Sequence, residues 1–246
     1  MNQERGGQAY GDEEAPINKR TVVVSPVGTD TENGTALINA LAAIVDASQT
    51  KKYLLYIEPG TYDLGSATLQ MKEHVDIEGA GELSTLITSS AARFNVPAGT
   101  VLGADDAELR FLTVRNTGTG AVGSWSAAIL NLATSPRLTH VTAEVIASRS
   151  INTGVFNALS AGTPIITDVI ATASVDATNI GVENVLCSPT IKQSKLSGSY
   201  NSLLHARGGT TTIALTQLAG PIATSKGGAV RCFNNYDENL HAVTCP

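Results

Sequence analysis

Apolar residues along this chain come in short runs, and small or turn-forming residues separate the runs almost to the end. Leu54–Ile57 stops at Pro59 and Gly60, and a second phrase, Val75–Gly81, follows the same plan. Runs of about four to seven residues between glycine, proline and asparagine are typical of short β-strands joined by tight turns. The pattern therefore predicts a chain that is almost wholly β, with a first strand at Thr21–Val24.

One segment departs from this pattern and has the periodicity of a helix. Its apolar residues recur at intervals of three and four and form one stripe, namely Leu37, Ile38, Leu41, Ile44 and Val45. Asn33, Gly34 and Thr35 precede the stripe and offer capping side chains. We expect an amphipathic helix over residues 35–48.

The β region is self-similar, which indicates a repeat architecture. Its anchor residues lie 29, 28, 25 and 22 residues apart, and they are Leu109, Leu138, Ile166, Ile191 and Ile213. The residues three places on also align, as Leu112, Val141, Val169, Ser194 and Thr216. Those five places on are Val114, Ala143, Ala171, Leu196 and Leu218. A separate column carries Asn131, Asn157, Asn184, His205 and Cys232. No repeat has enough apolar residues to fold alone, so neighbouring repeats must stack.

Stacked repeats predict one all-β domain over residues 20–246, a parallel β-helix solenoid. Strands of adjacent coils would lie about 4.8 Å apart, so like residues would form vertical ladders. The column Asn131, Asn157 and Asn184 is expected to be such a ladder; the alternative is that asparagine is merely common in turns. The helix would cap one end of the solenoid. Residues 226–246 would close the other, and residues 1–19 would form a loose polar arm or the remnant of a tag.

Composition narrows the class of partner. The chain is 42% hydrophobic and 15% charged, which suits a folded domain, and its net charge is −6. Nucleic acid is excluded as a partner, because phosphates demand clustered lysine and arginine and the sequence has no basic run. No apolar run approaches the ~18 residues of a membrane-spanning helix.

The three cysteines bear on the compartment. Cys232 and Cys245 lie close together near the C-terminus, whereas Cys187 stands apart. A Cys232–Cys245 disulfide would clamp the tail and imply an oxidising compartment; the alternative is three buried thiols in a cytosolic protein. The first twenty residues carry no signal segment. We expect an extracellular or periplasmic protein whose leader is not in this sequence.

The opening of the β region resembles a known superfamily. A strand, a helix and then the segments IEPGTYDL and VDIEGAGELSTLI resemble the start of right-handed parallel β-helix proteins of the pectate-lyase type. The turn Pro59-Gly60-Thr61-Tyr62 is one residue shorter here than in that pattern. The resemblance implies the fold and leaves the activity open, because the superfamily includes lyases, hydrolases, esterases, phage tailspikes and adhesins.

The catalytic sets of that superfamily are not found in this sequence. Pectate-lyase members hold calcium with several aspartates and use an arginine as base. Pectin methylesterase-like members carry paired aspartates with nearby glutamine and arginine. The one Asp-Asp pair, Asp105–Asp106, lies just before an anchor strand and is expected to be a solvated turn; the alternative is a calcium site with oxygen ligands. No other cofactor is expected.

The repeat register places a polar patch on one flat wall. If the columns three and five places beyond the anchor point inward, those two, four and six places beyond it face outward on the same wall. For the anchor also to point inward, the strand must kink between the anchor and the third place. His140 would then adjoin Asp168, and Arg115 would adjoin Glu144. The hypothesis is a carbohydrate groove in which Asp168 orients His140 as a general base; the alternative is cross-strand pairing of charges. Further side chains expected to contact substrate are Lys195, Gln193 and Trp125.

We predict from these features a non-catalytic exported β-helix protein, an extracellular or surface module that is structural or contacts glycans. Its partner would be a polysaccharide or a cell-surface glycan, and its oligomeric state stays open. One alternative is an atypical polysaccharide lyase or hydrolase acting on acidic glycans. A second alternative is the receptor-binding shaft of a phage or an adhesin.

Overall fold

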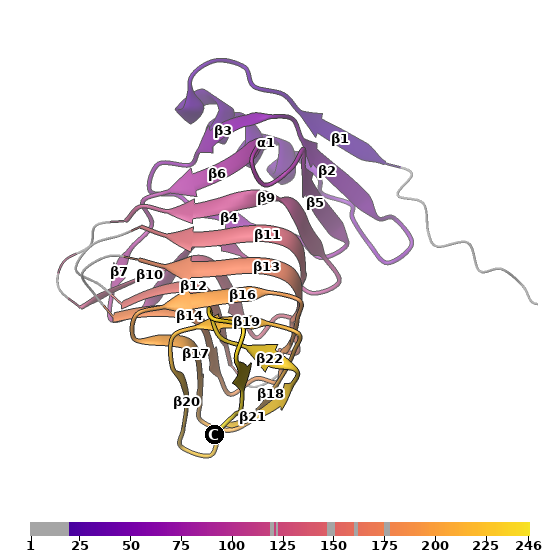
Figure 1. Cartoon of the computed structure of the whole chain (residues 1–246). Helices are drawn as coiled ribbons and strands as arrows, with labels where there is room; N and C mark the ends of the chain where they lie inside the picture. Colours follow the sequence, from indigo (N-terminus) through magenta and orange to yellow (C-terminus); the bar gives the residue numbers. More distant parts are fainter. Residues whose placement is uncertain (1–19, 119–120, 122, 147–150, 160–161, 175–177) are drawn as a thin grey trace, which may run out of the picture.

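The computed structural model describes residues 20–118, 121, 123–146, 151–159, 162–174 and 178–246. The predicted arm, residues 1–19, lies outside the described residues. The described chain forms one parallel β-solenoid of about six turns with one helix near its N-terminal end (Figure 1). The all-β prediction is confirmed.

The strands of the described residues belong to three sheets. The largest has 15 strands, which are β1 (Thr21–Val24), β2 (Tyr53–Ile57), β3 (Gly60–Asp63), β5 (Val75–Gly79), β6 (Thr85–Ser89), β9 (Glu108–Asn116), β11 (Arg137–Val145), β13 (Ile165–Ala173), β15 (Thr190–Lys192), β16 (Lys195–Gly198), β18 (Thr210–Ala214), β19 (Gln217–Ala219), β21 (Ala229–Phe233), β22 (Asn235–Tyr236) and β23 (Ala242–Val243). The second has six strands, which are β7 (Arg93–Phe94), β10 (Ser124–Leu132), β12 (Ile151–Ala158), β14 (Thr178–Val185), β17 (Asn201–Ala206) and β20 (Ile222–Ser225). The third pairs β4 (Leu69–Gln70) with β8 (Pro97–Leu102).

The predicted anchor column is the centre of the core. Leu138 pairs with Leu109 on one side and Ile166 on the other, and the file continues through Ile191 to Ile213. All five side chains have an exposed fraction of 0%. Like apolar residues in parallel register bury one another, so each coil contributes to a shared interior that no coil could form alone.

A bend divides each long strand into two segments. The residue two places after each anchor has a left-handed backbone, with φ between 50° and 56°, at Phe111, His140, Asp168, Gln193 and Leu215. Sequence reasoning required a kink here, but it placed these residues on one flat wall, and that placement is wrong. The left-handed residue turns the chain between two walls, because it interrupts the alternation of side chains.

The strands before the bend form the first wall, and those after it form the second wall. The first wall contains β2, β5, β15, β18, β21 and the first segments of β9, β11 and β13. The second wall contains β3, β6, β16, β19 and the second segments of the same three strands. The six-stranded sheet is the third wall. Figure 1 shows β9, β11 and β13 curving one above another.

The helix α1 spans Asp30–Ala43, so the predicted range 35–48 is wrong by five residues at each end. Its N-cap is Thr29, which forms a capping box with Glu32. Asn33, expected to precede the helix, is buried inside it because its Oδ1 accepts hydrogen bonds from the amides of Val27 and Gly28. Val45, expected in the apolar stripe, lies beyond the helix and is 87% exposed.

Leu37 and Leu41 carry the apolar face of α1 and are buried in the core. The helix packs against β3, and a Cβ atom at Gly34 would overlap the carbonyl oxygen of Asp63. Glycine therefore permits a closer approach of helix to strand than any other residue would. Among the described residues, no helix has both the length and the hydropathy needed to cross a bilayer.

Asparagine side chains form a continuous chain of hydrogen bonds inside the solenoid. Asn131 donates to Asn157 over 2.7 Å, Asn157 to Asn184 over 2.8 Å, and Asn184 to the hydroxyl of Thr211 over 2.8 Å. His205 pairs in register with Asn184, as the column predicted. Cys232 does not continue this column.

Cys232 lies on β21 and pairs with Ile213, so it belongs to the anchor column instead. It forms a disulfide with Cys245, with Cα atoms 5.7 Å apart. The third cysteine, Cys187, is a buried free thiol whose pKa burial raises to about 11. The disulfide ties the last residues of the chain to the end of the first wall.

Candidate functional site

A groove of about 510 Å³ runs over the outer face of the second wall. Its lining comes from β3, the turn between β5 and β6, β6 itself, and the second segments of β9 and β11. The lining residues are Gly60, Thr61, Glu82, Leu83, Ser84, Leu86, Thr113, Arg115, Thr142 and Glu144. Two of the predicted site residues, Arg115 and Glu144, lie here. The volume is within the range of small-molecule sites.

The groove is held together by hydrogen bonds between residues far apart in the sequence. Thr142 donates from Oγ1 to Glu82 Oε1 over 3.0 Å, and Thr113 donates to the carbonyl oxygen of Glu82 over 2.6 Å. Arg115 donates from Nε to Glu144 Oε1 over 2.7 Å, and its Nη2 lies 2.7 Å from the same oxygen. The turn that carries Glu82 is thereby fixed against β9 and β11.

The bend places the second predicted pair on the ridge between the first and second walls. His140 Nε2 lies 3.3 Å from Asp168 Oδ2, and each side chain is 47% exposed. The ring of Phe111 lies 5.0 Å from that of His140, at an interplanar angle of 32°. Asp168 therefore orients an accessible imidazole, and an exposed phenyl ring lies beside it.

The bend also separates the two carboxyl groups that were expected to share one wall. Asp168 lies beside His140, between the register pairs Thr139–Thr167 and Val141–Val169, and Glu144 lies four residues beyond His140 on β11. Four residues of strand span about 13 Å. A glycosidase needs its two carboxyl groups about 5–9 Å apart across the scissile bond. The geometry therefore disfavours Asp168 and Glu144 as a glycosidase pair.

The remaining predicted contacts are dispersed. Gln193 lies at the bend one coil beyond Asp168, and Lys195 follows on the second wall, where it pairs with Ile170. Trp125 lies on the third wall, where its ring meets Phe156 edge-on with centroids 5.9 Å apart. The structure thus does not bring Trp125 to the groove.

The third wall carries a second apolar cluster, separate from the main core. Its buried residues are Ala127, Leu130, Phe156 and Ala158. Glu183 is the one carboxyl group on the strands of this wall, and burial raises its pKa to about 7. The hydroxyl of Thr153 lies 3.5 Å from its Oε2. A single acid in apolar surroundings does not form a catalytic pair.

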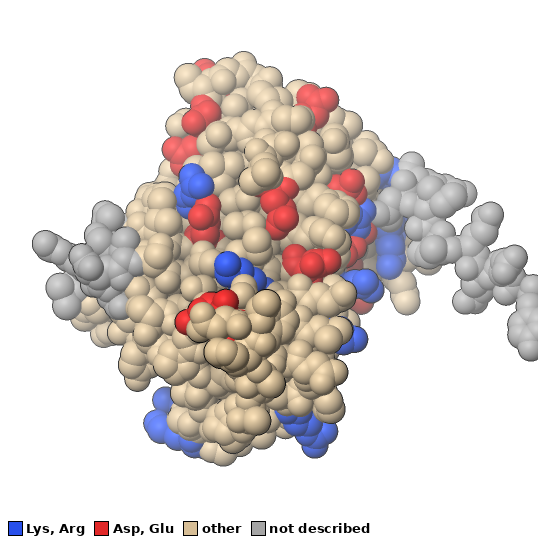
Figure 2. Space-filling model, in the orientation of Figure 1, with Lys and Arg blue, Asp and Glu red and all other residues tan. Residues whose placement is uncertain are grey.

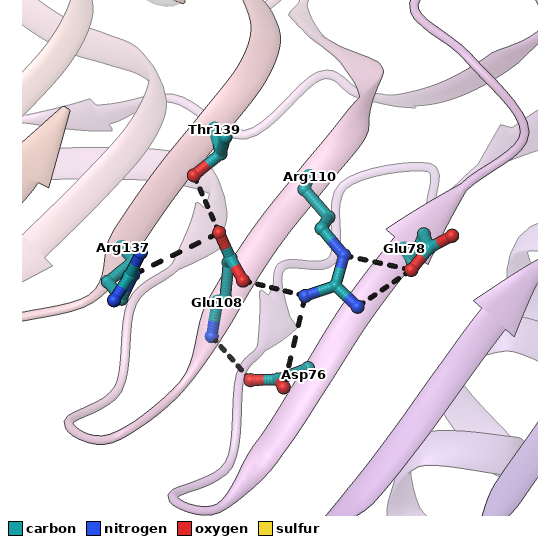
Figure 3. Close-up of polar contacts among 6 residues, drawn as sticks. All are labelled: Asp76, Glu78, Glu108, Arg110, Arg137 and Thr139. Carbon is teal, nitrogen blue, oxygen red and sulfur yellow. Dashed lines mark hydrogen bonds and ion pairs between the residues drawn. The ribbon is translucent and has the colours of Figure 1, made fainter. Parts of the chain in front are cut away.

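The first wall carries an ion network that sequence reasoning missed (Figure 3). Arg110 Nε and Nη2 reach Glu78 Oε2 over 2.8 and 2.7 Å, and Arg110 Nη1 donates to Glu108 Oε2 over 2.6 Å. Asp76 accepts from the amide of Glu108 over 2.9 Å, and Thr139 donates to Glu108 Oε1 over 2.6 Å. The signal was the pairing of Ile77 with Leu109, which sets the acids of one coil beside the arginine of the next.

The Asp-Asp pair is divided between two environments. Asp105 Oδ1 accepts from the amide of Ser135 over 2.7 Å. Asp106 lies with Glu73 and His74, and one possible ligand atom from each lies within 4.8 Å of the others. Imidazole in this set suits zinc or another borderline metal better than calcium, which prefers oxygen. The two aspartates therefore have different neighbours.

Figure 2 shows the second wall face-on, with acidic and basic side chains interspersed over β6, β9, β11 and β13. Acids exceed cations in both described clusters: Glu82 and Glu144 line the groove together with Arg115, and Arg110 contacts three carboxylates. This surface offers many hydrogen-bond acceptors beside few available cations.

No protein-family model and no curated protein matches this chain. Among solved structures, it is similar to pectin methylesterase PemA from Erwinia chrysanthemi, at 12% identity and a TM-score of 0.57, over 94% of this chain and 92% of that chain. It is also similar to pectin methylesterase from carrot, at 13% identity and a TM-score of 0.52, over 93% and 86%. A putative glycosyl hydrolase from Parabacteroides merdae aligns at 10% identity and a TM-score of 0.50, over 87% and 93%. The chain therefore has the right-handed parallel β-helix fold of these pectin methylesterases, as the sequence predicted.

Proposed function

We propose that this protein is a non-catalytic exported module that binds glycans in the groove of the second wall. The observation that carries the proposal is the groove itself, in which Arg115, Thr113 and Thr142 are already paired with Glu82 and Glu144. Fixed polar groups on a rigid sheet favour recognition, since their positions do not change on binding.

The arrangement of the acids supports binding rather than catalysis. A pectin methylesterase-like site carries paired aspartates with glutamine and arginine, and the described residues bring together no such set. The acids that do cluster on the first wall, Asp76, Glu78 and Glu108, are joined by Arg110 and by main-chain and threonine donors. A general acid or base needs a proton-transfer site within reach of substrate, and these groups are engaged with one another.

Export is supported by the cysteines. A disulfide between Cys232 and Cys245 persists in an oxidising compartment and is rare in the cytosol. Cys187 is buried and has no second thiol to pair with, because the other two cysteines form the disulfide. Calcium is not part of the proposal, because Asp105 and Asp106 turn to different partners.

The shaft alternative has one observation in its favour and one against it. Leu159 and Leu186 are 52% and 40% exposed and follow one another at a corner of adjacent coils. The next residues at that corner are Arg207 and Lys226. A trimeric shaft needs a long apolar stripe, and charges end this one after two coils.

The test measures binding and turnover on the same sample. Calorimetry with neutral and acidic oligosaccharides reports binding; unsaturated product, reducing ends and released acid report lyase, hydrolase and esterase turnover. We expect binding without turnover. Thr142→Val, which removes the hydroxyl that fixes Glu82, should weaken binding several-fold, and Thr190→Val on β15 should leave it unchanged.

Turnover would replace the proposal with the enzyme alternative if it disappears in His140→Ala or Asp168→Asn. Absence of binding to every oligosaccharide, with the protein folded, would remove glycan recognition from the proposal.

A further inference from the structure

We propose that the groove of the second wall selects an uncharged glycan and rejects the uronate form of the same sugar chain. The inference rests on the proposed glycan binding and specifies its ligand class. It follows from the charges that line the groove and from which of their atoms are already engaged.

The lining of the groove has an acidic balance. Glu82 and Glu144 are its two carboxylates, and Arg115 is its one cation among the described lining residues. A sugar chain with a carboxylate on each unit would bring further negative charge against this surface. At close range, and with limited solvent between the groups, such repulsion is only partly screened by salt.

The positive charge of the groove is already paired with Glu144. Arg115 directs both Nε and Nη2 at Glu144 Oε1, each over 2.7 Å, and its side chain is 36% exposed. To bind an incoming carboxylate through the same donors, Arg115 would have to release Glu144, which is 23% exposed. The exchange would leave one carboxylate without its partner, so it gains little.

The acceptors of the groove match the hydroxyl groups of a neutral sugar. Glu82 Oε1 holds one hydrogen bond, from Thr142, and a carboxylate oxygen can accept more than one. Sugar hydroxyls donate, and charge-assisted bonds from a hydroxyl to a carboxylate are short and strong. Leu83, which is fully exposed at the edge of the groove, offers an apolar contact to the C–H face of a sugar ring.

Charges outside the groove also disfavour the uronate form. Asp168 projects from the ridge beside the groove, and the chain as a whole has a net charge of −6. A polyanion would therefore meet a repulsive field before it reached the groove, which slows association. An uncharged chain meets no such barrier.

The experiment compares matched hexamers that differ only at C6. Linear hexamers of glucose, mannose and galactose are paired with hexamers of the corresponding uronates, and each is titrated into the intact protein at neutral pH. We expect at least one neutral hexamer to bind about tenfold or more tightly than its uronate, a difference of about 1.4 kcal/mol. Raising the salt concentration should narrow that difference, because screening weakens the repulsion.

Tighter binding of the uronates would overturn this inference and leave the proposed glycan binding in place. No binding of any hexamer would overturn both. Glu82→Gln keeps the shape of the side chain and removes its charge, so it should bring the uronate affinity closer to the neutral one. Glu73→Gln, at an exposed carboxylate outside the groove, is the matched control and should leave the ratio unchanged. Equal effects of the two substitutions would contradict a role for the groove.

Discussion

Arg110 joins three carboxylates on the first wall, and its replacement by methionine tests how far that network stabilises the fold. Methionine keeps the apolar part of the side chain and removes the guanidinium, so the change isolates the charge. Glu78 would lose two contacts and Glu108 one, while Asp76, 4.0 Å from Nη1, would lose its nearby positive charge. Three like charges would then remain together on adjacent strands.

The expected loss follows from burial. Breaking a buried ion pair by removing one partner costs about 3–5 kcal/mol. The four side chains keep between 17% and 25% exposure, so solvent relieves part of this cost. We expect the free energy of unfolding to fall by about 2–3 kcal/mol at neutral pH. The melting temperature should fall by roughly 5–10 °C.

Arg115→Met is the matched control, because it makes the same change on the same strand. Arg115 contacts one carboxylate and is 36% exposed, so its loss should cost at most about 1 kcal/mol. Urea unfolding followed by circular dichroism measures both variants. Equal and small losses would refute the reasoning, since the network would then contribute no more than a surface pair.

The pH dependence separates charge from packing. Burial acts to lower the pKa of Arg110, but its hydrogen bonds with Glu78 and Glu108 outweigh this effect and raise the pKa, so the guanidinium stays charged. Its stabilisation requires ionised partners, so the deficit of Arg110→Met should be smaller in acid than at neutral pH. A deficit that is the same in acid and at neutral pH would indicate lost packing instead.

Four further outcomes are expected. Asn157→Ala leaves two ladder partners unsatisfied in the core and should cost about 2–4 kcal/mol in urea unfolding. Gln193 has φ of 50°, so Gln193→Asn should stabilise by about 0.5 kcal/mol and Gln193→Val should destabilise by about 1 kcal/mol, both by melting temperature. The pKa of Glu183 is raised to about 7, so the folded state favours its neutral form; stability is full below about pH 4.5 and declines as the pH rises to about 7, and Glu183→Gln should abolish that decline. Reducing the Cys232–Cys245 bond should cost about 3 kcal/mol, measured with and without reductant.

The core was predictable because stacking makes like positions repeat. Leu109, Leu138 and Ile166 occupy equivalent places in successive coils, and only apolar side chains satisfy a position that every neighbouring coil buries. Because every coil needs an apolar residue at this position, the pattern recurs several times and can be recognised in a single sequence. Cys232 was assigned to the asparagine column because the last coil is short. It lies one strand further along, where it pairs with Ile213 of the anchor column.

The helix boundaries were not predicted because tertiary contacts determined them. Asn33 and Gly34 are residue types that often cap helices, but both lie within α1. Asn33 accepts hydrogen bonds from the main chain before the helix, and Gly34 allows β3 to approach closely. Local preference is overruled where a side chain is needed elsewhere. The capping-box pattern of Thr29 followed three residues later by Glu32 marks the start of the helix, and it lies just before the predicted range.

Only some of the groove residues were predicted, because the others do not recur in the repeat. Arg115 and Glu144 are one coil apart and appear in the repeat columns, whereas Glu82 comes from a turn that no other coil repeats. Its hydrogen bond with Thr142 joins residues 60 positions apart in the sequence. A feature that occurs once leaves no periodic trace, so sequence columns cannot reveal it.

The bend explains why polar and aromatic side chains that could bind a ligand are exposed along one ridge. On the walls, each residue must either fill the core or match its neighbours across the strands. At the bend, the left-handed backbone of Phe111, His140 and Asp168 interrupts that alternation, and their side chains project to solvent. The backbone accepts a cost of about 1–2 kcal/mol per non-glycine residue there, which the stacked walls on either side offset. Recognition can therefore vary along this ridge and the adjacent groove without disturbing the buried columns that hold the coils together.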